Sequence, residues 1–202
     1  MQRVGNLSNV IEVWDFEGPI RDVESRISDS LPELIRRHDT LRKGAINALF
    51  FIGDITNMGK GTIAREVNGN GIRLKPGSMK VFRAHMAEGA TMVISTNNGH
   101  SKKIEEIMFQ NAGKVIVRHC SPGEKAALQK ELQAENPEKD VISINDSTKE
   151  VVYDVAHGLR RNSILFKDGH NSIPALIMRA LGIVKVASES NIDSAIRSAI
   201  RT

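Results

Sequence analysis

The sequence has little of what marks several large classes of protein. Aromatic residues make up only 4% of its 202 residues, so side chains that could stack on single-stranded nucleic acid are scarce. Its single cysteine, Cys120, cannot form a disulfide within the chain, which suits a reducing compartment. The formal net charge of +4 is small, and we expect it to favour small phosphorylated molecules over nucleic acid.

Long hydrophobic runs are also absent. The apolar run at residues 48–52 is among the longest, far short of the ~20 residues that a membrane-spanning helix needs. The first ten residues lack the apolar core of a signal peptide. We therefore expect a cytoplasmic protein with no membrane partner, whose oligomeric state the sequence leaves open.

The residues that are present predict one folded domain with an alternating order of elements. Hydrophobic residues make up 40% of the chain, enough for a sizeable core. Strands are expected at residues 9–16, 91–95, 115–117, 140–144, 163–166 and 183–187. Helices are expected between and after them at residues 78–88, 101–111, 123–134, 148–157, 173–181 and 192–200.

This alternation predicts an α/β, Rossmann-like three-layer sandwich with a central, mostly parallel sheet. The first strand is far from the others in sequence. Residues 21–50 between them show helix-like apolar spacing, and residues 53–78 are rich in glycine. We therefore expect a core formed by residues 1–20 and 76–202, with a small helical cap inserted at residues 21–75.

Polar residues follow the apolar runs of three of the predicted strands. They are Asp15 and Glu17, then Ser95, Thr96 and Asn97, and then Asn145, Asp146 and Glu150. Lys125 lies near the start of a predicted helix between the second and third groups. Because ligands bind outside the carboxyl ends of the strands in an open parallel sheet, we expect these side chains to converge there.

These residue types together favour phosphoryl chemistry. A carboxylate can attack phosphorus and hold the phosphoryl group covalently, and a second acid can protonate the leaving group. Carboxylates from two strands suit Mg²⁺, which offsets the repulsion between an anionic nucleophile and an anionic substrate. A hydroxyl and an ammonium can hold the phosphoryl oxygens.

Four segments resemble, in order, the motifs of the haloacid dehalogenase-like (HAD) superfamily, which consists mostly of phosphatases with an aspartate nucleophile. The segments are DFEGPI, VISTNN, SPGEK and ISINDSTKE. The first is similar to the D-x-E-G-P form seen in some archaeal members. The resemblance covers residues 9–20 and 76–200, which is the predicted core.

The resemblance implies an Mg²⁺-dependent phosphatase acting on a small phosphomonoester through an aspartyl-phosphate on Asp15. Glu17 would be the general acid/base, with its backbone carbonyl on the metal. Ser95 or Thr96 would bind the phosphate, with Asn97 beside them. Lys125 would stabilise the transferring group. Asp15 and Asp146 would bind the metal, with support from Glu150.

Three departures from the motifs leave a second function open. Glu17 stands where the second aspartate is usual, and its extra methylene moves the proton donor. Asn145 replaces a glycine, and Glu150 replaces an aspartate. A catalytically degenerate module that binds a phosphorylated ligand or a protein would show the same pattern.

Two further segments carry alternative motifs. Asp168, in KDGHNS, also resembles the fourth motif, but it lies 43 positions after Lys125, whereas Asp146 lies at the usual 21. Asp146 is therefore the favoured metal ligand and Asp168 the alternative. If Asp146 binds the metal, Asp168 is expected in a loop near the substrate mouth. The segment GDITNMGKGT, residues 53–62, resembles the phosphate loop of a nucleotide kinase, although its spacing is one residue too long. A mobile cap loop and a plain surface loop are the other interpretations.

Overall fold

The sheet of this protein is parallel throughout. The structure is a computed structural model that describes residues 6–56, 72–97, 101–121, 123–159, 162–166, 182 and 184–200. The strands are β1 (Val10–Asp15), β2 (Thr91–Thr96), β3 (Ile116–His119), β4 (Asp140–Asn145), β5 (Ser163–Phe166) and β6 (Lys185–Ala187). Their order is β3-β2-β1-β4-β5-β6, and each neighbouring pair is parallel. This order confirms the predicted α/β Rossmann-like fold.

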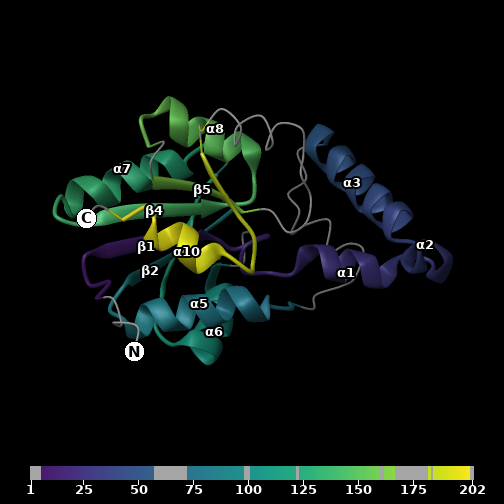
Figure 1. Ribbon diagram of the computed structural model, residues 1–202, viewed down its shortest axis with the longest axis horizontal. Helices are drawn as coiled ribbons and strands as arrows, with labels where there is room; N and C mark the ends of the chain where they lie inside the picture. The colour runs from purple at the N-terminus through teal and green to yellow at the C-terminus, as the bar shows by residue number, and fades with distance from the viewer. Residues whose placement is uncertain are drawn as a thin grey trace.

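Helices cover both faces of the sheet and complete three layers (Figure 1). One face packs against α5 (Pro76–Ala87), α6 (Ser101–Ala112) and α10 (Ile192–Arg197). The other packs against α7 (Lys125–Glu135) and α8 (Thr148–Ala156). These elements lie close to their predicted positions, and the helix expected at 173–181 falls outside the described residues.

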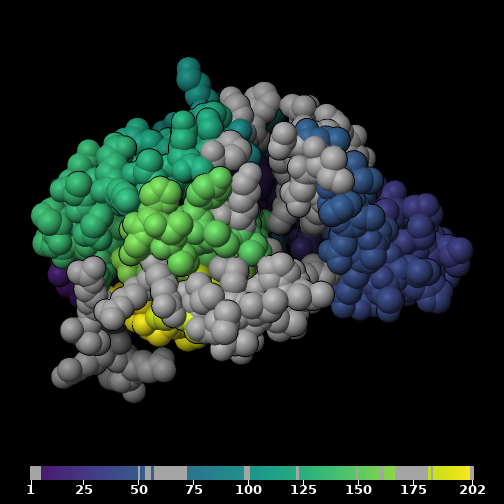
Figure 2. Space-filling model, turned by 90° about the horizontal axis from the view of Figure 1, so that it is seen from above, coloured from purple at the N-terminus to yellow at the C-terminus, as the bar shows by residue number. Residues whose placement is uncertain are grey.

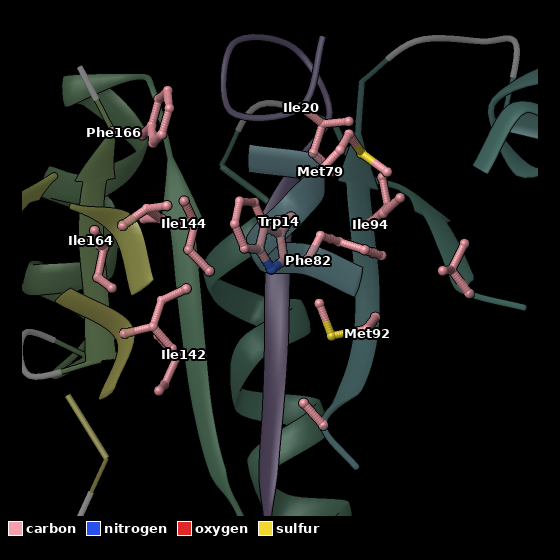
Figure 3. Packing of buried hydrophobic residues seen from close by; sticks show 14 of the residues in the cluster. Trp14, Ile20, Met79, Phe82, Met92, Ile94, Ile142, Ile144, Ile164 and Phe166 are labelled. Atoms are coloured by element: carbon pink, nitrogen blue, oxygen red, sulfur yellow. The ribbon is translucent and has the colours of Figure 1, made fainter. Parts of the chain in front are cut away.

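The largest apolar cluster lies on the α5 face, around Trp14 (Figure 3). Trp14 and Phe82 of α5 are fully buried and meet edge to face, with ring centroids 5.6 Å apart. Removing each such large side chain from water contributes about 1.5–3 kcal/mol to folding. The packing fixes β1 in the centre of the sheet, and with it the strand end that carries Asp15.

Three helices follow β1 in the predicted cap: α1 (Val23–Ser30), α2 (Glu33–Arg37) and α3 (Asp39–Ile55). They stand to one side of the sheet, and the space-filling view shows a hollow between them and the core (Figures 1 and 2). The two ends of the segment meet, because Asp22 N–H donates to the carbonyl of Arg73 (2.7 Å) and Lys75 N–H to that of Ile20 (2.8 Å). Nothing in the described residues tests the boundaries 21 and 75, which stay a prediction.

The sequence predicts a helical stretch over residues 21–50, whereas the structure divides it. Leu31 is extended, with ψ 147°, because the ring of the following Pro32 disfavours helical backbone at the preceding residue. Pro32 then occupies the N-cap position of α2, directly before its first helical residue, Glu33. None of the helices in the described residues is long and apolar enough to cross a membrane.

Candidate active site

Strands β1, β2 and β4 bring the predicted site residues to one edge of the sheet. Asp15 is the last residue of β1 and is in register with Ser95 of β2. On the other side, Trp14 is in register with Ile144, so that Asp146 follows β4 beside the loop after Asp15. The parallel register therefore gathers residues that are more than a hundred positions apart in the sequence.

Asp15 forms a buried ion pair with Lys125. Lys125 Nζ lies 2.5 Å from Asp15 Oδ2, and the two residues are 6% and 5% exposed. Lys125 is the first residue of α7, and Asp15 lies on the α7 face of β1, so the ammonium reaches the strand end. A buried carboxylate held by one cation is placed as a nucleophile would be.

The electrostatic surroundings shift the pKa of both partners upward. Burial raises the pKa of Asp15 most; Lys125 lowers it, and the charges of Asp146 and Glu17 raise it further, to about 7. Burial alone would lower the pKa of Lys125, but Asp15, Asp146 and Glu150 outweigh burial and raise it. Asp146 and Glu17 thus lie close enough to act on Asp15, as the sequence predicts.

Glu17 is held on two sides. Thr96 Oγ1 donates a hydrogen bond to Glu17 Oε2 (3.2 Å), and Arg21 Nη1 lies 3.8 Å from Glu17 Oε1. All three residues are buried. Thr96 therefore contacts the predicted general acid, whereas the hydroxyl of Ser95 reaches only the carbonyl of Trp14, at 3.5 Å.

The loop after β1 makes room for Asp146. Gly18 has φ +98°, and a Cβ on it would overlap the Asp146 carboxylate. Glycine is thus required here both for its conformation and for this close approach. Asp146 is 8% exposed and lies next to the turn that carries Glu17, which suits a shared ligand site.

Glu150 and Asn145, two of the departures from the motifs, have structural contacts of their own. Glu150 Oε1 accepts the N–H of Gly123 (3.2 Å), in the turn before Lys125, so it fixes the loop that leads into α7. Asn145 Nδ2 donates to Ser143 (2.6 Å) and to Asp154 (3.3 Å), on the α8 side of the sheet. The asparagine therefore belongs to a buried hydrogen-bond network with Ser143 and Asp154.

The residues at this edge fit a hard divalent cation. In the described part of the chain, no three His, Cys, Asp or Glu side chains form a metal cluster by themselves. The set that the motifs imply needs only two carboxylates, Asp15 and Asp146, with the carbonyl of Glu17 and water. The mutual repulsion that raises the pKa of Asp15 is relieved when a cation binds, and oxygen ligands suit Mg²⁺.

Some of the predicted residues are not brought into this group. Asn97 follows β2 and is exposed. Asp168 and residues 57–62 of the GKGT segment lie outside the described residues. The apolar run before that segment, residues 48–52, belongs to α3, whereas a kinase phosphate loop follows a strand. The nucleotide-kinase interpretation therefore lacks the preceding strand that it requires, and its GKGT residues remain untested.

Two buried cations near the site are not among the predicted site residues. Arg21 is 3% exposed and lies against Glu17, four positions away. Lys75 is 6% exposed, with its ammonium 5.0 Å above the ring of Phe166 at the end of β5. Burial lowers the pKa of Lys75, although Glu24, Asp22, Glu189 and Asp146 oppose this. Only the Arg21 spacing gave a signal that sequence reasoning could have used.

No protein-family model and no curated protein matches the chain. Among solved structures, an HAD family hydrolase from Deinococcus radiodurans, with bound phosphate and sodium, is 15% identical; the match covers 96% of this chain and 97% of that one, with a TM-score of 0.57. A protein assigned as a phosphoglycolate phosphatase from Lactobacillus delbrueckii is 12% identical; the match covers 94% of this chain and 98% of that one, with a TM-score of 0.57. A protein assigned as a β-phosphoglucomutase from Bacteroides vulgatus is 13% identical; the match covers 98% of this chain and 92% of that one, also with a TM-score of 0.57. The chain shares the fold of these proteins.

Proposed function

We propose that this protein is an HAD-like, Mg²⁺-dependent phosphatase that hydrolyses a small phosphomonoester through an aspartyl-phosphate on Asp15. The observation that carries the proposal is the buried pair of Asp15 and Lys125, 2.5 Å apart at the carboxyl edge of the sheet. The acids Glu17 and Asp146 act on the same carboxylate. The first motif, DFEGP, is consistent with the archaeal D-x-E-G-P form, and the proposed partner is a small cytoplasmic metabolite.

In the proposed reaction, an oxygen of Asp15 attacks phosphorus and the bond from phosphorus to the ester oxygen breaks. Glu17 gives a proton to the departing oxygen, which leaves as an alcohol. Water then attacks the phosphoryl group, Glu17 takes its proton, and the bond to Asp15 breaks to release inorganic phosphate. Lys125 stays beside Asp15 and stabilises the charge on the transferring group.

The carboxylates of Asp15 and Asp146 and the carbonyl of Glu17 would hold the metal. Bound Mg²⁺ would supply positive charge that offsets the repulsion between Asp15 and the substrate. Ser95 is the better donor to a phosphoryl oxygen, because its hydroxyl makes only a long contact while that of Thr96 is engaged with Glu17. Thr96 then orients the acid.

Phosphate release from a panel of phosphomonoesters, with and without Mg²⁺, tests the proposal. We expect metal-dependent turnover in the wild type and its loss in Asp15→Asn. Asp29→Asn, on the exposed surface of α1, is the matched control and keeps turnover. Mass spectrometry of acid-quenched protein should find the phosphoryl group on the peptide that contains Asp15. Turnover that survives in Asp15→Asn would rule out this nucleophile.

A binding module without turnover is the second candidate. The observation that favours it is the clamp of Thr96 and Arg21 on Glu17, which stabilises the ionised form of the group that must supply a proton. If no ester is hydrolysed by folded protein that binds Mg²⁺ and phosphate, this candidate replaces the first. Glu17→Asp would then show whether the longer acid is the cause.

A further inference from the structure

A second buried charge network lies on the opposite face of β1 from the candidate active site. His85 of α5 is fully buried between two carboxylates. Its Nδ1 lies 2.7 Å from Oε1 of Glu12 in β1, and its Nε2 lies 2.7 Å from Oδ1 of Asp193 in α10. None of these residues belongs to the motifs that the sequence shares with the HAD superfamily.

The two contacts favour the charged form of His85. A neutral imidazole donates from one nitrogen only, so its other nitrogen would present a lone pair to a carboxylate. With a carboxylate at 2.7 Å on each side, an imidazolium donates to both, and although burial lowers the pKa of the ring, hydrogen bonding and charge from Glu12 and hydrogen bonding from Asp193 raise it. His85 therefore supplies the positive charge that faces the fully buried Glu12.

The network reaches the residue that precedes the nucleophile. Trp14 Nε1 donates to Glu12 Oε2 (2.9 Å), so one carboxylate joins the imidazolium to the indole. Figure 3 shows the indole beside Phe82, with its nitrogen directed back toward the start of β1. Trp14 is thus fixed by one hydrogen bond and one ring contact, and Asp15 is the next residue along the strand.

We propose that His85, as an imidazolium, is a positioning residue that clamps Glu12 and Trp14 and so holds the end of β1 from which Asp15 projects. Removal of the proton from His85 releases the clamp. Its role in turnover rests on the proposed phosphatase function, whereas the clamp itself does not. We call Glu12, His85, Asp193 and Trp14 the Trp14 clamp.

The charges around His85 make the clamp sensitive to a rise in pH. Burial would lower the pKa of His85, but hydrogen bonding and charge from Glu12, with hydrogen bonding from Asp193, outweigh it and raise the pKa. Arg197 of α10 opposes the rise, although it is itself bonded to Asp193 and to both oxygens of Glu88. The clamp is therefore closed below about pH 6.5 and opens as the pH rises through the raised value.

The protein offers a direct probe, because Trp14 is its single tryptophan. Its fluorescence and its one indole N–H resonance can be followed from pH 6 to pH 10 without metal or substrate. We expect a one-proton transition at a pH above the ordinary histidine pKa of 6.5, abolished in His85→Gln and moved to lower pH in Glu12→Gln, which keeps an oxygen near the indole. Asp15→Asn removes the neighbouring carboxyl, which also titrates, and should leave this transition in place. His157→Gln, at an exposed histidine, is the matched control.

Turnover gives the second readout. In the wild type, kcat should fall as the pH rises, with the midpoint of the indole transition, at unchanged KM. His85→Gln should lower kcat at pH 7, by up to ~100-fold for a displacement near 1 Å, and lose that pH-dependent fall. A transition that persists in His85→Gln, or that Glu12→Gln does not move, overturns the clamp. A His85-dependent transition in a protein without turnover supports the clamp and rejects the phosphatase function.

Discussion

Substituting alanine for Gly18 tests whether the loop after β1 positions Asp146. Gly18 has φ +98°, a conformation that costs an L-residue about 1–2 kcal/mol. An added Cβ would also overlap the Asp146 carboxylate, so either the loop or Asp146 has to move. We expect the displacement to be close to 1 Å, which is enough to lower turnover by ~100-fold.

Gly158 separates the two effects. It has φ +83°, but a Cβ there meets no atom of the described residues within 4 Å. Gly18→Ala and Gly158→Ala should therefore both lose about 1–2 kcal/mol, which for a chain of this length lowers Tm by roughly 2–8 °C. Only Gly18→Ala should lose turnover and need more Mg²⁺ for half-maximal activity.

A measurement independent of turnover follows from the same geometry. Burial is the largest cause of the raised pKa of Asp15, about 7, and the charge of Asp146 adds to the rise, so moving Asp146 away should lower that pKa in the metal-free protein. NMR titration of the Asp15 carboxyl carbon would measure the change. Equal turnover in Gly18→Ala and Gly158→Ala, with an unchanged pKa at Asp15, would refute the assigned role of the loop.

Two further predictions concern the site itself. In metal-free buffer, the free energy of unfolding of Asp15→Asn should rise relative to that of the wild type by up to about 4 kcal/mol between pH 4 and pH 7, because the fold raises the pKa of Asp15 from 3.8 to about 7 and its ionisation destabilises the folded state. Loss of the partner of Lys125 adds a destabilisation that does not depend on pH in this range. Urea unfolding at several pH values measures the difference, and a difference that does not change with pH would contradict this origin. Ser95→Ala should raise KM for the ester, because Ser95 binds the phosphate. Thr96→Val should lower kcat at constant KM, because it releases Glu17. Steady-state kinetics with the reverse pattern would exchange the roles of Ser95 and Thr96.

Much of the fold could be predicted from the sequence, because strands buried on both faces read as continuous apolar runs. The residues VIEVWD and TMVIST are of this kind, and the structure places them as β1 and β2. The cap was less predictable. Its helices expose large apolar side chains, including Leu34 and Phe51, so their periodicity does not mark a single buried face. The break at Leu31 depends on one local rule for the residue before proline.

The candidate site divides in the same way. Asp15, Lys125 and Asp146 follow strands or begin a helix, so the parallel topology alone predicts that they meet. Contacts between a helix and the face of a sheet follow no such rule. His85 and Glu12 are 73 positions apart and belong to no motif, and only the packing of α5 on β1 brings them together.

Strand β1 therefore carries two buried carboxylates, one on each face of the sheet. Ile11 and Val13 pack with the α7 side, where Asp15 meets Lys125, and Trp14 packs with the α5 side, where Glu12 meets His85. Each acid faces one cation, because an unpaired charge in such a position would destabilise the fold by several kcal/mol. The cations differ in kind. The pKa of Lys125 is raised from 10.5 by Asp15, Asp146 and Glu150 despite its burial, whereas that of His85 is raised from only 6.5, so the acid on the α5 face loses its cation at a lower pH than the acid on the α7 face.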